Sequence, residues 1–87
     1  MISKIFSVFD SKAEAYLPPM FVQSRGVAIR MFSSAVADEK HDFFRYPADY
    51  TLFELGQFDD SNAQFILHST PVSLGLASEF KAANTTP

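Results

Sequence analysis

The chain has 87 residues, enough for one hydrophobic core and too few for two, because domains of this size bury only about 60–65% of their unfolded surface. It contains no cysteine, which excludes disulfides and thiolate metal sites, and no apolar run approaches the roughly 18 residues of a membrane span. The net charge of -3 is unlike the strongly basic composition typical of nucleic-acid-binding domains. We expect a cytosolic protein with no membrane association.

The first segment, Ile2–Phe9, is rich in β-branched and aromatic residues. Both of its alternating sets of side chains include apolar ones, which predicts a central strand covered on both faces. The following segment, Lys12–Gln23, contains Pro18 and Pro19, each with a fixed φ and no backbone donor. We predict an ordered, extended loop for it.

Ser24 is a suitable N-cap for a helix that runs to about Asp38. One apolar stripe at helical spacing comprises Ala28, Met31, Phe32, Ala35 and Val36. This stripe predicts that the helix packs on the sheet. A polar connection, 38–42, follows it.

Tyr50–Phe58 is predicted to be the second strand, with a bulge or a close backbone approach at Gly56. Its alternation assigns Phe53 and Leu55 to one face, and Leu52 and Phe58 to the other. The run 59–62 is a strong turn signal, and Gln64–His68 supplies a third strand. These two strands should form an antiparallel hairpin.

Thr70 and Pro71 predict the start of a short helix that carries Val72, Leu76 and Phe80, since proline is favoured at the first helical position. The expected fold is therefore α+β, with a small antiparallel sheet of about three strands, one main helix packed on it, and the order β-α-β-β before a short C-terminal helix. Residues 1–81 form the single domain, and 82–87 form a frayed tail.

The charges are divided unevenly along the chain. Residues 1–45 carry six basic and five acidic side chains, whereas 46–87 carry Lys81 against five acidic ones. The basic side chains that could contact phosphates are Lys4, Lys12, Arg25, Arg30, Lys40 and Arg45, with Arg25 in the first turn of the predicted helix. The alternative is a mixed, solvated surface on which these cations do not gather.

Catalytic and metal-binding patterns are missing from the sequence. His41 and His68 lack the local spacing of metal ligands, and the chain has neither a Gly-x-Ser-x-Gly elbow nor a Gly-rich phosphate loop. Asp59 and Asp60 are better explained by a turn than by an acid/base pair. The aromatic residues of 46–50 either anchor a loop or stack on a base. We therefore expect no enzymatic activity, no metal and no cofactor.

Three segments carry a resemblance to a known family. They are 5–16 (IFSVFDSKAEAY), 26–30 (GVAIR) with Phe32, and 47–59 (PADYTLFELGQFD). In order and spacing they resemble the small nonstructural protein of gokushovirus-type microviruses, which are bacteriophages with single-stranded DNA genomes. Beyond Asp60 the similarity is limited mainly to Pro71, Glu79 and Phe80.

This resemblance implies a DNA-binding accessory protein, similar to the microvirus C protein, that acts in the host cytoplasm. Such a protein helps to switch genome replication toward single-stranded DNA synthesis and packaging. DNA is then the expected partner, contacted mainly through its phosphates. The resemblance assigns these contacts to Lys12 and Arg30, the basic residues inside the matched segments, and the charge argument adds Lys4 and Arg25. The alternative is a protein-interaction module that binds a phage replication or capsid protein, or a second copy of itself, because ten phenylalanines exceed what one small monomer readily buries.

Overall fold

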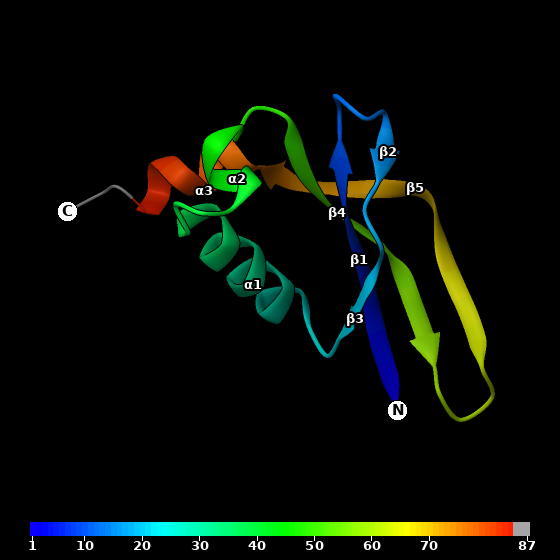
Figure 1. The fold of residues 1–87 in the computed structure, drawn as a ribbon. Helices are drawn as coiled ribbons and strands as arrows, with labels where there is room; N and C mark the ends of the chain where they lie inside the picture. The colour runs from blue at the N-terminus through cyan, green and yellow to red at the C-terminus, as the bar shows by residue number, and fades with distance from the viewer. Residues whose placement is uncertain (85–87) are drawn as a thin grey trace.

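An antiparallel sheet carries all the helices of residues 1–84 on one of its faces (Figure 1). The computed structural model describes these residues. Its strands are β1 (Ile2–Asp10), β2 (Ala15–Tyr16), β3 (Met20–Val22), β4 (Tyr50–Asp59) and β5 (Gln64–Leu76). Its helices are α1 (Arg25–Ala37), α2 (Asp42–Arg45) and α3 (Ala77–Asn84). The order in the sheet is β2-β1-β4-β5, and β3 also pairs with β1. The α+β class is confirmed, with five strands in place of about three.

The first strand is central, as its composition predicts, because β2 and β3 pair with β1 on one side and β4 pairs with it on the other. Phe6 and Val8 are buried beneath the helices. Ile5 and Ser7 point to the opposite face and are also buried. The prediction that this strand is covered on both faces is therefore confirmed for residues 5–8, although no helix lies on the second face (Figure 1).

The main helix begins where its N-cap predicts. The Oγ of Ser24 accepts a hydrogen bond from the backbone N–H of Val27 at 3.3 Å, which satisfies one donor of the first turn. Ala28, Phe32 and Val36 are buried against the sheet. Met31 departs from the predicted stripe, because about half of it is exposed at the edge of the contact.

The segment predicted as a loop contains two short strands. Phe21 pairs with Ile5 in β3, and Tyr16 pairs with Phe9 in β2. The prolines at 18 and 19 lie between these strands, where no sheet hydrogen bond requires a backbone donor. The predicted connection at 38–42 likewise runs into α2, whose N-cap is His41: its Nδ1 accepts from the backbone N–H of Phe43 at 3.1 Å.

Gly56 forms the predicted bulge. Glu54 pairs with Phe6 and Gly56 pairs with Ile5, so that Leu55 is an extra residue in β4. One extra residue reverses the alternation, and Phe58 therefore shares a face with Phe53. The predicted grouping of Leu52 with Phe58 is wrong for this reason.

The hairpin of β4 and β5 is confirmed, but β5 extends to Leu76, and the helix predicted from Pro71 is wrong. Between the pairs Gly56–Leu67 and Glu54–Val72, four residues of β5 lie opposite Leu55 alone. Pro71 belongs to this irregular stretch, where its missing N–H costs no regular ladder bond. Helix α3 starts at Ala77 and continues to Asn84, beyond the expected start of the tail at residue 82; residues 85–87 lie outside the described part of the chain.

We predict that Gly56→Ala destabilises the protein by about 1–3 kcal/mol. A Cβ at this position would stand 2.3 Å from the carbonyl oxygen of Ile66 and 2.7 Å from the Cα of Leu67, and the φ of +155° is one that L side chains rarely adopt. Chemical denaturation followed by circular dichroism measures the change.

Gly26→Ala is the matched control. Gly26 lies in the first turn of α1, where a Cβ would meet only the Ser24 Oγ, at 3.9 Å. Alanine should stabilise the helix there by about 0.5–1 kcal/mol. Equal effects of the two substitutions would contradict a special role for the bulge.

Candidate functional site

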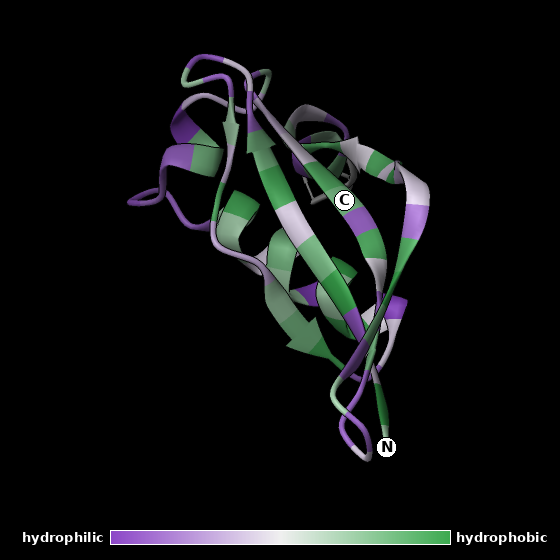
Figure 2. Ribbon diagram, turned by 90° about the vertical axis from the view of Figure 1, so that its right-hand side faces the viewer, coloured by the Kyte–Doolittle hydropathy of each residue, from purple (hydrophilic) through white to green (hydrophobic). Residues whose placement is uncertain are grey.

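The sheet face turned away from the helices is covered by no helix of the described residues, and Figure 2 looks onto it. Strand alternation and pairing identify the side chains on it. They are Ser3, Ile5, Ser7, Phe9, Tyr16, Phe21, Thr51, Phe53, Phe58, Phe65, Leu67, Ser73 and Leu76, and we call this surface the open face. None of these residues is charged, so the open face offers apolar and ring contacts.

Two groups of aromatic rings occupy the open face. Near the end of β1, the ring of Tyr16 lies edge-on to those of Phe9 and Phe53, with centroids 4.9 and 5.7 Å apart. Near the start of β1, Phe21, Phe58 and Phe65 form a triangle with centroid separations of 4.7–6.3 Å. These distances are within the range of favourable aromatic pairs.

The rings stand on a buried floor and remain accessible themselves. Ile5 and Ser7 are almost fully buried between the two groups, and the Oγ of Ser7 donates to the carbonyl oxygen of Leu17 at 2.6 Å. By contrast, 46% of Tyr16, 48% of Phe21 and 57% of Phe65 are exposed. Apolar side chains that stay exposed together on one face often mark a binding site.

Two of the four predicted phosphate-binding residues lie on the other side of the sheet, around a buried carboxylate. The Nε of Arg25 donates to one oxygen of Glu54 at 2.9 Å, and the Nε2 of His68 lies 2.8 Å from the other. Lys4 is close enough to lower the pKa of Glu54 by its charge. Arg25 and His68 are 52% and 40% exposed, whereas Glu54 is 5% exposed.

Glu54 is held as an anion by these partners. The hydrogen bond from Arg25 is the main cause that lowers the pKa of its carboxyl; burial opposes it, and the hydrogen bond with His68 and the charges of Arg25 and Lys4 add to the lowering. The arrangement ties the start of α1 to β4. It therefore has a structural explanation that needs no ligand.

The structure does not gather the four predicted residues into one patch. Lys12 lies just beyond the far end of β1, in a hollow with Tyr46 and Asp49. Arg30 is exposed on α1, five positions after Arg25, which corresponds to about 140° around the helix. The expected single basic face is thus replaced by Lys4 beside Arg25, with Lys12 and Arg30 apart from them.

The other predicted features have structural roles. Asp59 accepts hydrogen bonds from the N–H and the Oγ of Ser61, and Asp60 pairs with the N-terminal amine at 2.7 Å, which supports a turn. Of the two tyrosines in 46–50, Tyr50 is buried with its ring 4.6 Å from that of Phe43, so it anchors the segment, while Tyr46 is 56% exposed.

Among residues 1–84, no group of three or more His, Asp or Glu side chains is arranged to hold a metal ion. In the same part of the chain, no helix has the length and apolar character needed to cross a membrane.

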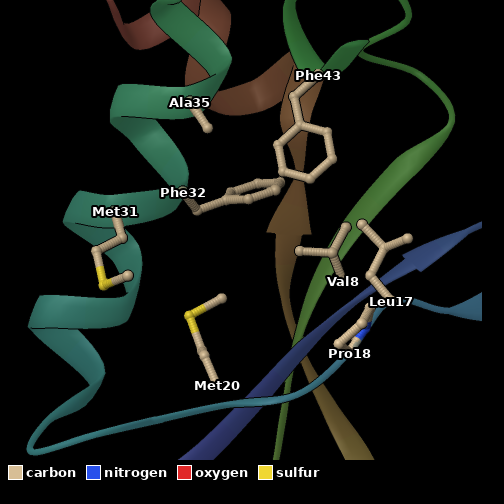
Figure 3. A pocket seen from close by; sticks show the side chains of 8 residues that line it. All are labelled: Val8, Leu17, Pro18, Met20, Met31, Phe32, Ala35 and Phe43. Atoms are coloured by element: carbon tan, nitrogen blue, oxygen red, sulfur yellow. The ribbon is translucent and has the colours of Figure 1, made fainter. Parts of the chain in front are cut away.

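A second hollow lies on the helix side of the sheet (Figure 3). Its volume is about 220 Å³, and α1, β1 and the segment between β2 and β3 surround it. The lining residues are Val8, Leu17, Pro18, Met20, Met31, Phe32, Ala35 and Phe43. This lining contains no titratable or nucleophilic side chain, so the hollow can accept an apolar group but offers no acid, base or nucleophile.

Sequence reasoning identified the aromatic surplus but not its location. The location could have been found from the alternation of Phe9, Phe53 and their neighbours, combined with the bulge at Gly56. Because β2 and β3 were predicted as a loop, Tyr16 and Phe21 were not predicted to lie in the sheet, and the open face was not predicted.

Comparison with known proteins identifies a family. The family model described as "Phage ORF5 protein" matches residues 3–80, which is most of the chain. The protein therefore belongs to the Phage ORF5 family and is a small bacteriophage protein. No curated protein and no solved structure matches it significantly.

We predict that Arg25→Gln raises the pKa of Glu54 and lowers stability by about 1 kcal/mol at neutral pH, a modest value because the guanidinium is half exposed. A carboxyl whose folded pKa is lowered contributes stability above its unfolded pKa and loses it as the pH falls through the folded pKa. The difference between wild type and variant should thus disappear in acid. Unfolding measured across this acidic range, with NMR titration of the carboxyl, checks both effects.

Arg30→Gln, on the same helix, is the control and should leave both quantities unchanged. A stability difference for Arg25→Gln that persists at acid pH would contradict the assigned ion pair.

Proposed function

We propose that this member of the Phage ORF5 family is a nonstructural accessory protein that binds single-stranded DNA on its open face. The observation that supports this proposal is the pair of half-exposed aromatic groups on an otherwise uncovered sheet. Every base has a π-face, and aromatic side chains on a sheet are a common platform for unpaired bases. The mode of binding would be stacking, without strong base preference and without catalysis.

The positions of the two groups suit a strand that crosses the face. Phe9 lies in one group, and Phe21 of the other pairs with Ile5, four residues earlier in β1. At about 3.3 Å per residue, the two groups are roughly 13 Å apart along the strand. A single strand that follows β1 would meet both groups in turn.

Lys12 would contribute a phosphate contact at one end of this path, because it follows the end of β1 that carries Phe9. Lys4 and Arg25 lie on the helix side, around Glu54, and Arg30 is exposed on α1, so these three would contribute less. Few phosphate contacts agree with the net charge of -3 and leave stacking as the main source of affinity.

The biological role that we propose follows from the microvirus resemblance. A protein that holds single strands in the host cytoplasm would help to divert the genome from duplex replication to single-strand synthesis and packaging. Stacking favours this form over duplex DNA, because the bases of a duplex are already stacked on one another.

The lack of charge on the open face favours a second candidate function, a protein-interaction module. Uncharged aromatic surfaces are frequent at the centres of protein interfaces. A phage replication or capsid protein would then be the partner. The two candidates differ in one measurable property, since only the first requires affinity for free oligonucleotides.

We predict that Tyr16→Ala and Phe21→Ala each weaken binding of an oligothymidylate by about 1–3 kcal/mol, or roughly 5- to 150-fold, because each removes a stacking partner. Fluorescence anisotropy at low salt measures the affinity. The control is Tyr46→Ala, which removes an exposed aromatic ring that lies off the open face. Absence of binding by the wild type, or equal losses in all three variants, would exclude the proposed site.

We predict that Lys12→Gln flattens the plot of log affinity against log salt by about 0.7, the value for one phosphate contact on a single strand. Arg30→Gln should change this slope much less. The same titration repeated at several salt concentrations gives both slopes, and a larger effect of Arg30 would shift the nucleic-acid path to the helix side.

A further inference from the structure

The sheet ends in a long edge strand that nothing in the described chain covers. β5 is last in the strand order, and every residue from Gln64 to Ser73 is exposed. Phe65, Ile66 and Leu67 are 57%, 49% and 63% exposed in succession. An edge strand has one row of backbone N–H and C=O groups without partners in its sheet, and it can therefore accept another extended chain.

The opposite edge of the same sheet has the protection that natural edges usually show. Its strands, β2 and β3, have two and three residues, and Pro18 and Pro19 interrupt the edge between them. Lys12 and Glu14 place charges beside it. Short strands, prolines and charges all prevent strand addition, so only one edge of this sheet is open to a partner.

The unprotected part of β5 is short and definite. Pro71 and the irregular stretch opposite Leu55 interrupt the strand after Leu67. No Asp, Glu, Lys or Arg occurs between Asp60 and Glu79, so the segment Gln64–Leu67 has no charged residue to repel a second strand. A partner strand therefore has about four residues to pair with, and these are mainly apolar.

We propose that two copies of this chain pair antiparallel through the Phe65–Leu67 segments of β5, with the twofold axis at Ile66. A second copy presents the same uncharged, apolar edge, and a twofold rotation makes such an edge complementary to itself. Paired residues of two antiparallel strands project their side chains to the same face of the sheet. Only registers that pair an open-face residue of one copy with an open-face residue of the other therefore place both open faces on the same side of the joined sheet. Centring on Ile66 sets Phe65 opposite Leu67 of the partner subunit, and the apolar triplets then overlap completely.

This dimer would close its own edge and extend the open face. Because the other edge is protected, addition stops at two copies and does not continue into a fibre. The triangle of Phe21, Phe58 and Phe65 ends at the β5 edge, so pairing would bring the two triangles side by side in one continuous sheet. This pairing is independent of DNA, and it would double the platform if the proposed function holds.

The test uses the full chain without DNA. Sedimentation equilibrium should show a mass that rises with concentration toward twice the 9.7 kDa of one chain. Ile66→Lys and Ile66→Glu should each be monomeric, because like charges would face each other at the axis. An equimolar mixture of the two variants, one of them isotopically labelled, should recover the dimer as a heterodimer, identified by its intermediate mass in native mass spectrometry.

Met31→Lys, which adds the same charge to an exposed side chain of α1, should dimerise like the wild type. Circular dichroism verifies that all variants are folded. A wild type that remains monomeric at every concentration, or a dimer that Ile66→Lys leaves intact, would overturn the proposal. Dissociation by Phe21→Ser with no effect of Ile66→Lys would also overturn it, since that result places the contact on the open face. DNA titration of monomeric Ile66→Lys reports separately on the proposed function.

Discussion

The packing of α1 on one face of the central strands is the contact on which the rest of the structure depends. Phe6, Leu52 and Phe32 are almost completely buried where sheet and helix meet. A chain of this length has material for two layers. Once the helices occupy one side of the sheet, the other side has no covering element, and the aromatic side chains of β1 to β5 that point there stay accessible.

The bulge at Gly56 determines which aromatic side chains of β4 lie on this uncovered side. Phe53 and Phe58 are five residues apart, and in a regular strand they would point to opposite faces. The extra residue in β4 brings both to the open face, one into each aromatic group. The backbone of Ile66 and Leu67 approaches Gly56 too closely for a Cβ, so the same glycine also holds the start of β5 against β4. Local backbone geometry thus determines both the open face and the edge beside it.

Sequence reasoning succeeded where one physical signal dominated and failed where tertiary pairing decided. Ser24 and the buried spacing of α1 were sufficient to place that helix, and the alternation of β1 identified a central strand. The short strands β2 and β3 have almost no intrinsic preference to form, and they exist because β1 offers them an edge. Pro71 favours a helix start locally, but cross-strand pairing of Val72 with Glu54 outweighs that preference.

The candidate site was harder to predict from the sequence than the fold, because it also depends on tertiary contacts. A one-dimensional reading can count cations but cannot detect that Arg25 is engaged by Glu54, which lies 29 positions away in sequence. Salt bridges of this kind reduce the charge available to a polyanion, whereas stacking on an aromatic face is unaffected by nearby carboxylates on the other side of a sheet. An acidic protein can hold a single strand if most of the affinity comes from ring contacts, and the separation of charges and rings onto opposite faces makes that mode physically consistent here.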